Sequence, residues 1–146
     1  MNLSRFFNTA TFTLLVAGAL APPVLADGNR ILIRQYGWHN GVGGSQHGHR
    51  NRMSFYQYGR GNTTVSAQDG NRNRVVVGQS GHANAASSTQ NGNCNIVGIA
   101  QFGGHHSANA SQNGNCNALA IIQTGHNNSA DAHQYGNGNI SIIVQD

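Results

Sequence analysis

Acidic side chains, which many catalytic and metal sites require, are scarce in this chain. There is no glutamate, and the four aspartates are Asp27, Asp69, Asp131 and Asp146. General acid–base catalysis by two carboxylates needs a close pair, and a calcium loop needs a run of acidic residues. Neither pattern is present, nor is a G-x-S-x-G nucleophile motif or a phosphate-binding glycine loop. The sequence therefore predicts that the protein is not an enzyme and needs no cofactor.

Histidine and cysteine are the other candidates for chemistry, and the chain has eight of the first and two of the second. His82, His105 and His126 would suit Cu or Zn, because imidazole binds both metals well. However, no carboxylate accompanies them and their positions in the repeat described next differ, so we interpret them as solvated turn residues rather than as a dedicated metal site. The role of the two cysteines, Cys94 and Cys116, depends on the elements that position them.

Those elements follow from a tandem repeat with the pattern Q-x-G-x-x-N-x-x-x-x-x. The repeated glutamines are Gln35, Gln46, Gln57, Gln68, Gln79, Gln90, Gln101, Gln112, Gln123, Gln134 and Gln145. Glycine follows two positions later at Gly37, Gly48, Gly59, Gly70, Gly81, Gly92, Gly103, Gly114, Gly125 and Gly136. Asparagine then occurs at Asn40, Asn51, Asn62, Asn73, Asn84, Asn95, Asn117, Asn128 and Asn139, and His106 replaces it once. Such regularity predicts a repetitive, stacked architecture.

An 11-residue period can also describe a right-handed helical coiled coil or a disordered Gln/Asn tract. A glycine in every repeat would cost a helix about 1 kcal/mol each, and the intervening residues are rich in Val, Ile, Thr and Ser, which do not favour helices. Charged residues make up only 8% of the chain, and Gly and Asn are abundant. This composition is typical of disorder, which we expect for the chain in transit. Disorder does not require regular spacing, so the repeat favours short strands.

A strand from each asparagine to the next glutamine, such as Asn95 to Gln101, would place both amides and two residues between them on one face. Identical amides stacked at about 4.8 Å can hydrogen bond to those above and below. The glycine lies in a tight arc between strands, where it supplies a positive φ. The repeat therefore predicts ladders of buried glutamine and asparagine side chains.

The inward residues between the amides show a second period, twice as long as the first. Alternate strands carry large pairs such as Val97 and Ile99, and the strands between them carry small pairs such as Ala108 and Ala110. We therefore predict an all-β fold: a two-sheet cross-β solenoid of 11-residue strand–arc units, with a 22-residue rung and about five and a half rungs. Large residues of one sheet would face small residues of the other, which leaves no room for a ligand cavity.

In this arrangement the two cysteines occupy equivalent arc positions in neighbouring rungs. A separation of about 4.8 Å between the Cα atoms of Cys94 and Cys116 falls within the range for a disulfide. Both a disulfide and a pair of free thiols fit this placement.

Positive charge is concentrated in the first half, where seven of the eight arginines lie between residues 30 and 74. Arg30, Arg52 and Arg74 fall in one outward column, and Arg50 and Arg72 fall in another. Like charges stacked at the rung spacing repel one another, which would slow premature aggregation. The same columns would suit an anionic polysaccharide or a nucleic acid, and the two interpretations are compatible.

The N-terminal segment has the features of a secretory signal peptide. Arg5 is followed by an apolar run over residues 12–21 and by small residues before a cleavage site after Ala26. The apolar run is too short to span a bilayer. We therefore predict a secreted protein, with a signal peptide over residues 1–26 and a repeat β-solenoid over residues 27–146.

The tandem pattern behind a signal peptide, as in the segment from Gln57 to Asn62, resembles the curlin repeat of bacterial curli fibre subunits. The resemblance covers essentially the whole mature chain. It implies a β-solenoid subunit of an extracellular amyloid fibre at the bacterial cell surface, used in adhesion and in biofilm matrix. It also implies partners: other copies of the chain, a companion curlin subunit and an outer-membrane secretion pore. His106 departs from the pattern, as does the lack of a separate Gly-rich targeting segment, a role that residues 35–48 would fill if they form no rung.

Within this interpretation, we expect fibres to grow by templating at the end strands, because the apolar segment 139–145 lacks residues that protect an edge. The sequence leaves open whether the chain is the major subunit or a minor subunit that nucleates the fibre. A monomeric solenoid that binds ice or carbohydrate would need a regular outward array. The outward residues are irregular, for example Arg52, Ser54 and Tyr56 in one strand, which disfavours this alternative.

Overall fold

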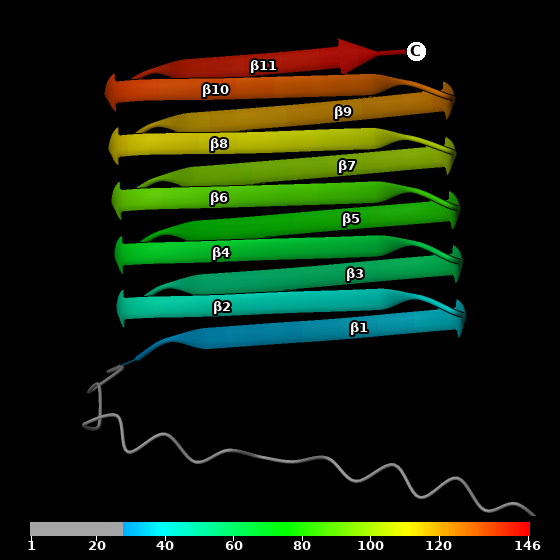
Figure 1. Cartoon of the computed structure of the whole chain (residues 1–146), viewed down its shortest axis with the longest axis horizontal. Helices are drawn as coiled ribbons and strands as arrows, with labels where there is room; N and C mark the ends of the chain where they lie inside the picture. Colours follow the sequence, from blue (N-terminus) through cyan, green and yellow to red (C-terminus); the bar gives the residue numbers. More distant parts are fainter. Residues whose placement is uncertain (1–27) are drawn as a thin grey trace, which may run out of the picture.

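A computed structural model describes residues 28–146, and the signal peptide predicted for residues 1–26 lies outside this range. The described residues form eleven strands joined by short connections (Figure 1). The strands are β1 (Arg30–Trp38), β2 (Gly41–His49), β3 (Arg52–Arg60), β4 (Thr63–Asn71), β5 (Arg74–His82), β6 (Ala85–Asn93), β7 (Ile96–Gly104), β8 (Ser107–Asn115), β9 (Ala118–His126), β10 (Ser129–Asn137) and β11 (Ile140–Gln145). Over this range, no helix has the length and apolar character needed to cross a membrane.

Successive strands alternate between two parallel sheets, so that the chain winds as a flat coil (Figure 1). The odd-numbered strands form a six-stranded sheet in the order β1-β3-β5-β7-β9-β11, and the even-numbered strands form a five-stranded sheet. Neighbouring strands are in register at a spacing of one rung, so that Gln79 pairs with Gln57 on one side and Gln101 on the other. The predicted two-sheet solenoid with 22-residue rungs is confirmed.

The first two strands form a regular rung. Gln35 of β1 pairs with Gln57 of β3, and Gln46 of β2 pairs with Gln68 of β4. Residues 35–48 therefore lie within the solenoid and continue its register.

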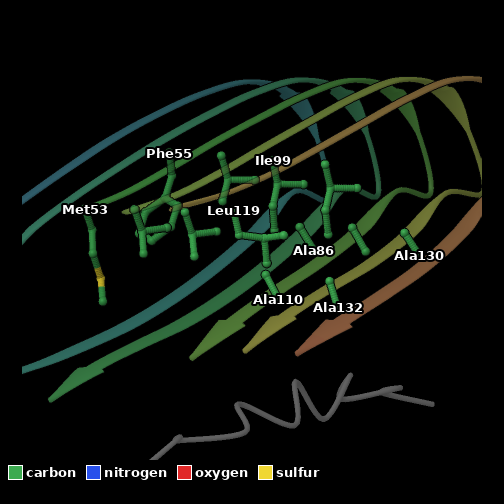
Figure 2. Close-up of a cluster of buried hydrophobic side chains, with 13 residues drawn as sticks. Met53, Phe55, Ala86, Ile99, Ala110, Leu119, Ala130 and Ala132 are labelled. Carbon is green, nitrogen blue, oxygen red and sulfur yellow. The ribbon is translucent and has the colours of Figure 1, made fainter. Parts of the chain in front are cut away.

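The core is a thin layer between the two sheets. Phe55, Ile99 and Leu119 project from the odd-numbered strands towards the alanines of the even-numbered strands, including Ala110 and Ala132 (Figure 2). The buried apolar side chains are Met53, Phe55, Val75, Val77, Ala86, Val97, Ile99, Ala108, Ala110, Leu119, Ile121, Ala130 and Ala132. Large side chains fill the space that small ones leave opposite, which gives the close packing that protein interiors require.

The strands begin and end later than the repeat predicts. Strand β7 begins one residue after Asn95 and continues beyond Gln101 through Gly103, which has a φ of 128°. Gly103 pairs with Gly125 in the next rung, so the positive φ bends the strand without interrupting the sheet. The glycine is therefore a bend within the strand, and the chain crosses to the other sheet further on.

The crossing occurs at the residue that precedes each repeat asparagine, which we call the corner residue. Corner residues adopt the left-handed conformation, with φ between 54° and 62° at His39, Arg50, Arg72, Ala83, Cys94, His105, Cys116 and Asn127. The remaining corners are glycines, such as Gly61 and Gly138. The corner N–H donates to a carbonyl of the neighbouring rung, as in the 2.9 Å bond from Cys94 to Asn71. These bonds stabilise the left-handed conformation, which residues other than glycine otherwise disfavour.

Candidate functional site: amide columns and open ends

The repeat glutamines form two continuous hydrogen-bonded columns, one in each sheet. In the odd-numbered sheet, Nε2 of Gln79 donates to Oε1 of Gln101 at 2.8 Å, and Nε2 of Gln101 donates to Oε1 of Gln123 at 2.9 Å. The same bond joins Gln35, Gln57, Gln79, Gln101, Gln123 and Gln145 in one column, and Gln46, Gln68, Gln90, Gln112 and Gln134 in the other. Every bond in both columns points towards the C-terminal end of the solenoid.

The same amides also link the two sheets. Nε2 of Gln101 donates to the carbonyl oxygen of Ala85 at 2.9 Å, across the solenoid edge. Gln101 is fully buried, and so are its neighbours in the column. Among the residues that the structure describes, every buried side-chain nitrogen or oxygen has a hydrogen-bond partner. The amides therefore escape the penalty of about 1–3 kcal/mol for an unsatisfied buried polar group.

Replacement of Gln101 by alanine is expected to slow fibre formation and lower the stability of the fold. The change removes one of the two acceptors of Nε2 of Gln79, which keeps its bond to Thr63, and it leaves Oε1 of Gln123 without its donor in the buried column. We expect a loss of about 1–3 kcal/mol per unsatisfied group, measured by denaturant resistance and by thioflavin assembly kinetics. Thr89→Ala, at an exposed outward position, is the control. Equal effects of the two changes would contradict the role of the amide column.

The repeat asparagines do not form the continuous amide-to-amide ladder that the sequence predicts. Oδ1 of Asn51 accepts the backbone N–H of Asn73 at 2.9 Å, and its Nδ2 donates to the carbonyl oxygen of Gly70 at 2.8 Å. The left-handed corner beside each asparagine places the side-chain amide next to the backbone of the next rung. The asparagine column is therefore held by hydrogen bonds between side chains and backbone. The same two backbone contacts recur at Asn40, Asn51, Asn62, Asn73, Asn84, Asn95 and Asn117.

Two further bonds vary among the repeat asparagines. Nδ2 of Asn117 also donates to Oδ1 of Asn95 at 3.2 Å, which adds one amide-to-amide bond to the backbone contacts. Nδ2 of Asn128 donates to the carbonyl oxygen of Thr124 within its own turn, and Nδ2 of Asn139 donates to that of Tyr135 at 2.8 Å. The same bond within the turn accompanies the contact to the next rung at Asn40, Asn51, Asn62 and Asn73.

His106 performs the asparagine role with an imidazole ring. Its Nδ1 accepts the N–H of Asn128 at 3.2 Å, and its Nε2 lies 3.2 Å from the carbonyl oxygen of Phe102. Its own N–H donates to Oδ1 of Asn84, as an asparagine at this position would. These partners select the tautomer with hydrogen on Nε2. The ring therefore preserves the contacts to the backbone N–H of the next rung and to the carbonyl of its own turn, whereas the bond that asparagines donate to the glycine of the next rung has no counterpart here.

The arc glycines allow the backbones of adjacent rungs to approach closely. At Gly81, with a φ of 123°, an added Cβ would collide with the carbonyl oxygen of Gly103. The equivalent collision occurs at Gly37, Gly48, Gly59, Gly70, Gly81, Gly92, Gly103 and Gly114, whereas Gly125 and Gly136 lie in the final rung without it. The glycine column is thus required by packing between rungs as well as by φ.

Cys94 and Cys116 are joined by a disulfide, with their Cα atoms 4.5 Å apart. Both are corner residues, in neighbouring rungs of the same edge. The sequence is compatible with either a disulfide or two free thiols at these positions, and the structure contains the disulfide.

We expect Cys94→Ser together with Cys116→Ser to lower resistance to denaturant without changing the fibre diffraction pattern. Closing a 22-residue loop stabilises the folded chain by about 3 kcal/mol in the chain-entropy model. Urea titration of the double variant against the oxidised protein would measure the loss. Mass spectrometry of a non-reducing digest should show the intramolecular Cys94–Cys116 peptide. A digest with intermolecular links alone would contradict the pairing.

Among residues 28–146, the two strands at each end of the solenoid pair on one side only. At the C-terminal end, β11 pairs with β9 and β10 pairs with β8 (Figure 1). Strand β11 also displays three apolar side chains on its outer face, Ile140, Ile142 and Val144, which are all strongly exposed. Unpaired strand edges of this kind are templates for another strand.

The arginines stack as the sequence predicts. Arg30, Arg52 and Arg74 are consecutive partners in the odd-numbered sheet and form one outward column. Arg50 and Arg72 line a groove along one edge of the solenoid, beside Cys94 and Cys116. Within residues 28–146, no three histidine, cysteine, aspartate or glutamate side chains are already placed to hold a metal ion.

Comparison with known proteins identifies the repeat. The family model for the curlin associated repeat matches residues 48–81 and residues 114–146. These segments include residues of both glutamine columns, arc glycines and left-handed corners. No curated protein matches the chain. With its matching repeat and its β-solenoid, the chain belongs to the curlin-repeat family of structural, curli-type fibre proteins.

Proposed function

We propose that this protein is the secreted, structural subunit of an extracellular curli-like amyloid fibre, and that the fibre grows by end-strand templating. The observation that carries the proposal is the open end of the solenoid, where β10 and β11 each have one edge without a partner strand among residues 28–146. A heterologous contact between such an edge and the first rung of another copy does not close on itself, and repetition of it gives a filament.

The direction of the glutamine columns supports addition of subunits head to tail. Each Nε2 donates towards the C-terminal end, so the last rung directs donors outward and the first rung directs acceptors outward. Nε2 of Gln145 already donates to the carbonyl oxygen of Ser129, in the same way that Gln101 donates to Ala85, so its second hydrogen would serve an acceptor in the next rung. An incoming first rung would offer Oε1 of Gln35 and Gln46. Head-to-head contacts would instead bring like groups together.

In the cell, we place this fibre at the bacterial surface, where it serves adhesion and biofilm matrix. The predicted signal peptide over residues 1–26 supports export, and the family resemblance supports a secretion pore and a companion curlin subunit as partners. The arginine column and the groove lined by Arg50 and Arg72 support contact with anionic polysaccharide or nucleic acid. The same basic first half supports the second candidate function, a minor subunit that nucleates the fibre at the membrane surface.

Incubation of the purified mature chain, followed by electron microscopy and fibre diffraction, tests the proposal. We expect unbranched fibres with a meridional reflection at about 4.8 Å and the strands perpendicular to the fibre axis. If the chain accelerates fibre formation by a companion subunit but does not elongate alone, the nucleator function is supported instead. A stable monomer that neither elongates nor seeds would contradict both.

A further inference from the structure

Three exposed histidines gather on one edge of the solenoid although they come from three different rungs. His82 ends β5, His126 ends β9, and His105 is the corner residue after β7. The ring of His82 lies 5.0 Å from the ring of His105 and 6.1 Å from the ring of His126, measured between centroids. The two rings at 5.0 Å are perpendicular to each other.

Gly104 is the reason that His82 and His126 approach each other. His82 pairs with Gly104 in the sheet, and Gly104 pairs with His126, so two rung spacings separate the histidines. The ring of His82 lies over Gly104, where an added Cβ would be 2.6 Å from Cε1 and Nε2 of that ring. Earlier residues of the same column, Trp38 and Arg60, have large side chains, so this gap is particular to one position.

The backbone holds the three positions in place. The N–H of His105 donates to the carbonyl oxygen of His82 at 3.0 Å, and the N–H of Asn127, next to His126, donates to that of Gly104 at 3.0 Å. The rings themselves are exposed, so they are able to turn about χ1 and χ2 while the backbone stays unchanged.

Two of the ring separations are compatible with a shared metal ion once the rings turn. Nitrogen ligands lie about 2.0–2.1 Å from Zn²⁺ in a tetrahedral site, which places the centroids of two imidazoles about 5 Å apart. The separation of 5.0 Å equals this value and that of 6.1 Å exceeds it, so a metal ion would draw the exposed rings together by rotation about χ1 and χ2.

We propose that His82, His105 and His126 form a binding site for a divalent transition metal, with Cu²⁺ preferred over Zn²⁺. Three imidazoles without a carboxylate suit these ions better than Ca²⁺ or Mg²⁺, and Cu²⁺ binds nitrogen ligands most tightly in the first-row series. This assigns a role to side chains that the sequence alone indicates to be solvated turn residues. The site requires only the fold, and it does not depend on the proposed function.

Titration of the purified mature protein with CuSO₄ tests the site, with isothermal calorimetry for affinity and electron paramagnetic resonance for the ligands. Circular dichroism would first verify the β-structure of each variant. We expect one tight Cu²⁺ per chain with a nitrogen hyperfine pattern. Replacement of His82, His105 and His126 by alanine should weaken binding by more than about tenfold. The matched control replaces three other exposed histidines, His39, His47 and His49, and should leave the tight site intact.

Gly104→Ala provides the sharper test, because it removes no histidine. Its Cβ would displace the ring of His82, so we expect weaker Cu²⁺ binding, by about tenfold, in a protein that remains folded. An unfolded or flexible chain would bind Cu²⁺ equally well with glycine or alanine at this position. Unchanged binding in Gly104→Ala, or an equal loss in the two triple-histidine variants, would overturn the proposal.

Discussion

Replacement of Ile142 by proline is expected to suppress fibre elongation strongly while leaving the subunit folded. In each earlier odd-numbered strand, the N–H of the residue after the asparagine donates to the next rung, as Ala118 does to Asn139. By the alternation of a parallel sheet, the N–H of Ile142 points out of the open end of the solenoid. Proline there removes a donor that an incoming copy would need, but no hydrogen bond between strands among residues 28–146.

The magnitude follows from the hydrogen bond that proline removes, which leaves its acceptor in the incoming strand unpaired. A penalty of about 1–3 kcal/mol at the docking contact corresponds to elongation that is slower by roughly fivefold to a hundredfold. Ile142→Ala is the matched control, because it removes the same apolar side chain and keeps the N–H. Seeded thioflavin kinetics would measure both variants, and a small fraction of the proline variant added to the native protein should shorten the fibres. Equal elongation rates for the two variants would contradict templating at β11.

Gly81→Ala is expected to destabilise the solenoid itself. The new Cβ would collide with the carbonyl oxygen of Gly103 in the next rung, and alanine disfavours the φ of 123° at this position. The strained backbone costs about 1–3 kcal/mol, and separation of the rungs adds to this. Since β5 has partners on both sides, the damage spreads to two rungs. We expect a marked fall in the urea midpoint and slow or absent fibre formation.

Gly98→Ala is the control for this change. Gly98 lies on the outer face of β7, and an added Cβ would meet nothing within 4 Å. Alanine is also the better strand residue of the two, because glycine loses more conformational freedom on folding. We therefore expect stability equal to or above that of the native chain. Similar losses for Gly81→Ala and Gly98→Ala would show that the close approach of the glycine column does not govern stability or assembly.

The period of the sequence was sufficient to predict which residues stack and which face the core. Gln101 lies between Gln79 and Gln123 because every rung contains the same number of residues, so that residues one repeat apart stack on one another. The alternation of large and small inward residues likewise predicts that Ile99 packs against alanines of the opposite sheet.

The bonds of the asparagines could not be predicted in the same way. Their partners depend on the path of the backbone at the corner, which places Gly70 beside the amide of Asn51. A signal was present, since Gly61 and Gly138 precede asparagine and glycine favours the left-handed conformation. His82 approaches His126 because Gly104 has no side chain to separate them. The spacing of the histidines in the sequence does not reveal this contact, which depends on how the rungs stack.

In the proposed fibre, the odd number of strands among residues 28–146 determines the symmetry of the filament. The first and last of these strands, β1 and β11, lie in the same sheet, and strands of the two sheets run in opposite directions (Figure 1). A second copy that continues the coil in parallel must place its β1 beside β10 and its β2 beside β11. Rotation by half a turn about the fibre axis achieves this, so successive subunits are related by a twofold screw operation. The arginine columns of consecutive subunits then lie on opposite faces of the fibre. Each subunit carries its arginine column on one sheet only, but the two faces of the fibre are chemically alike.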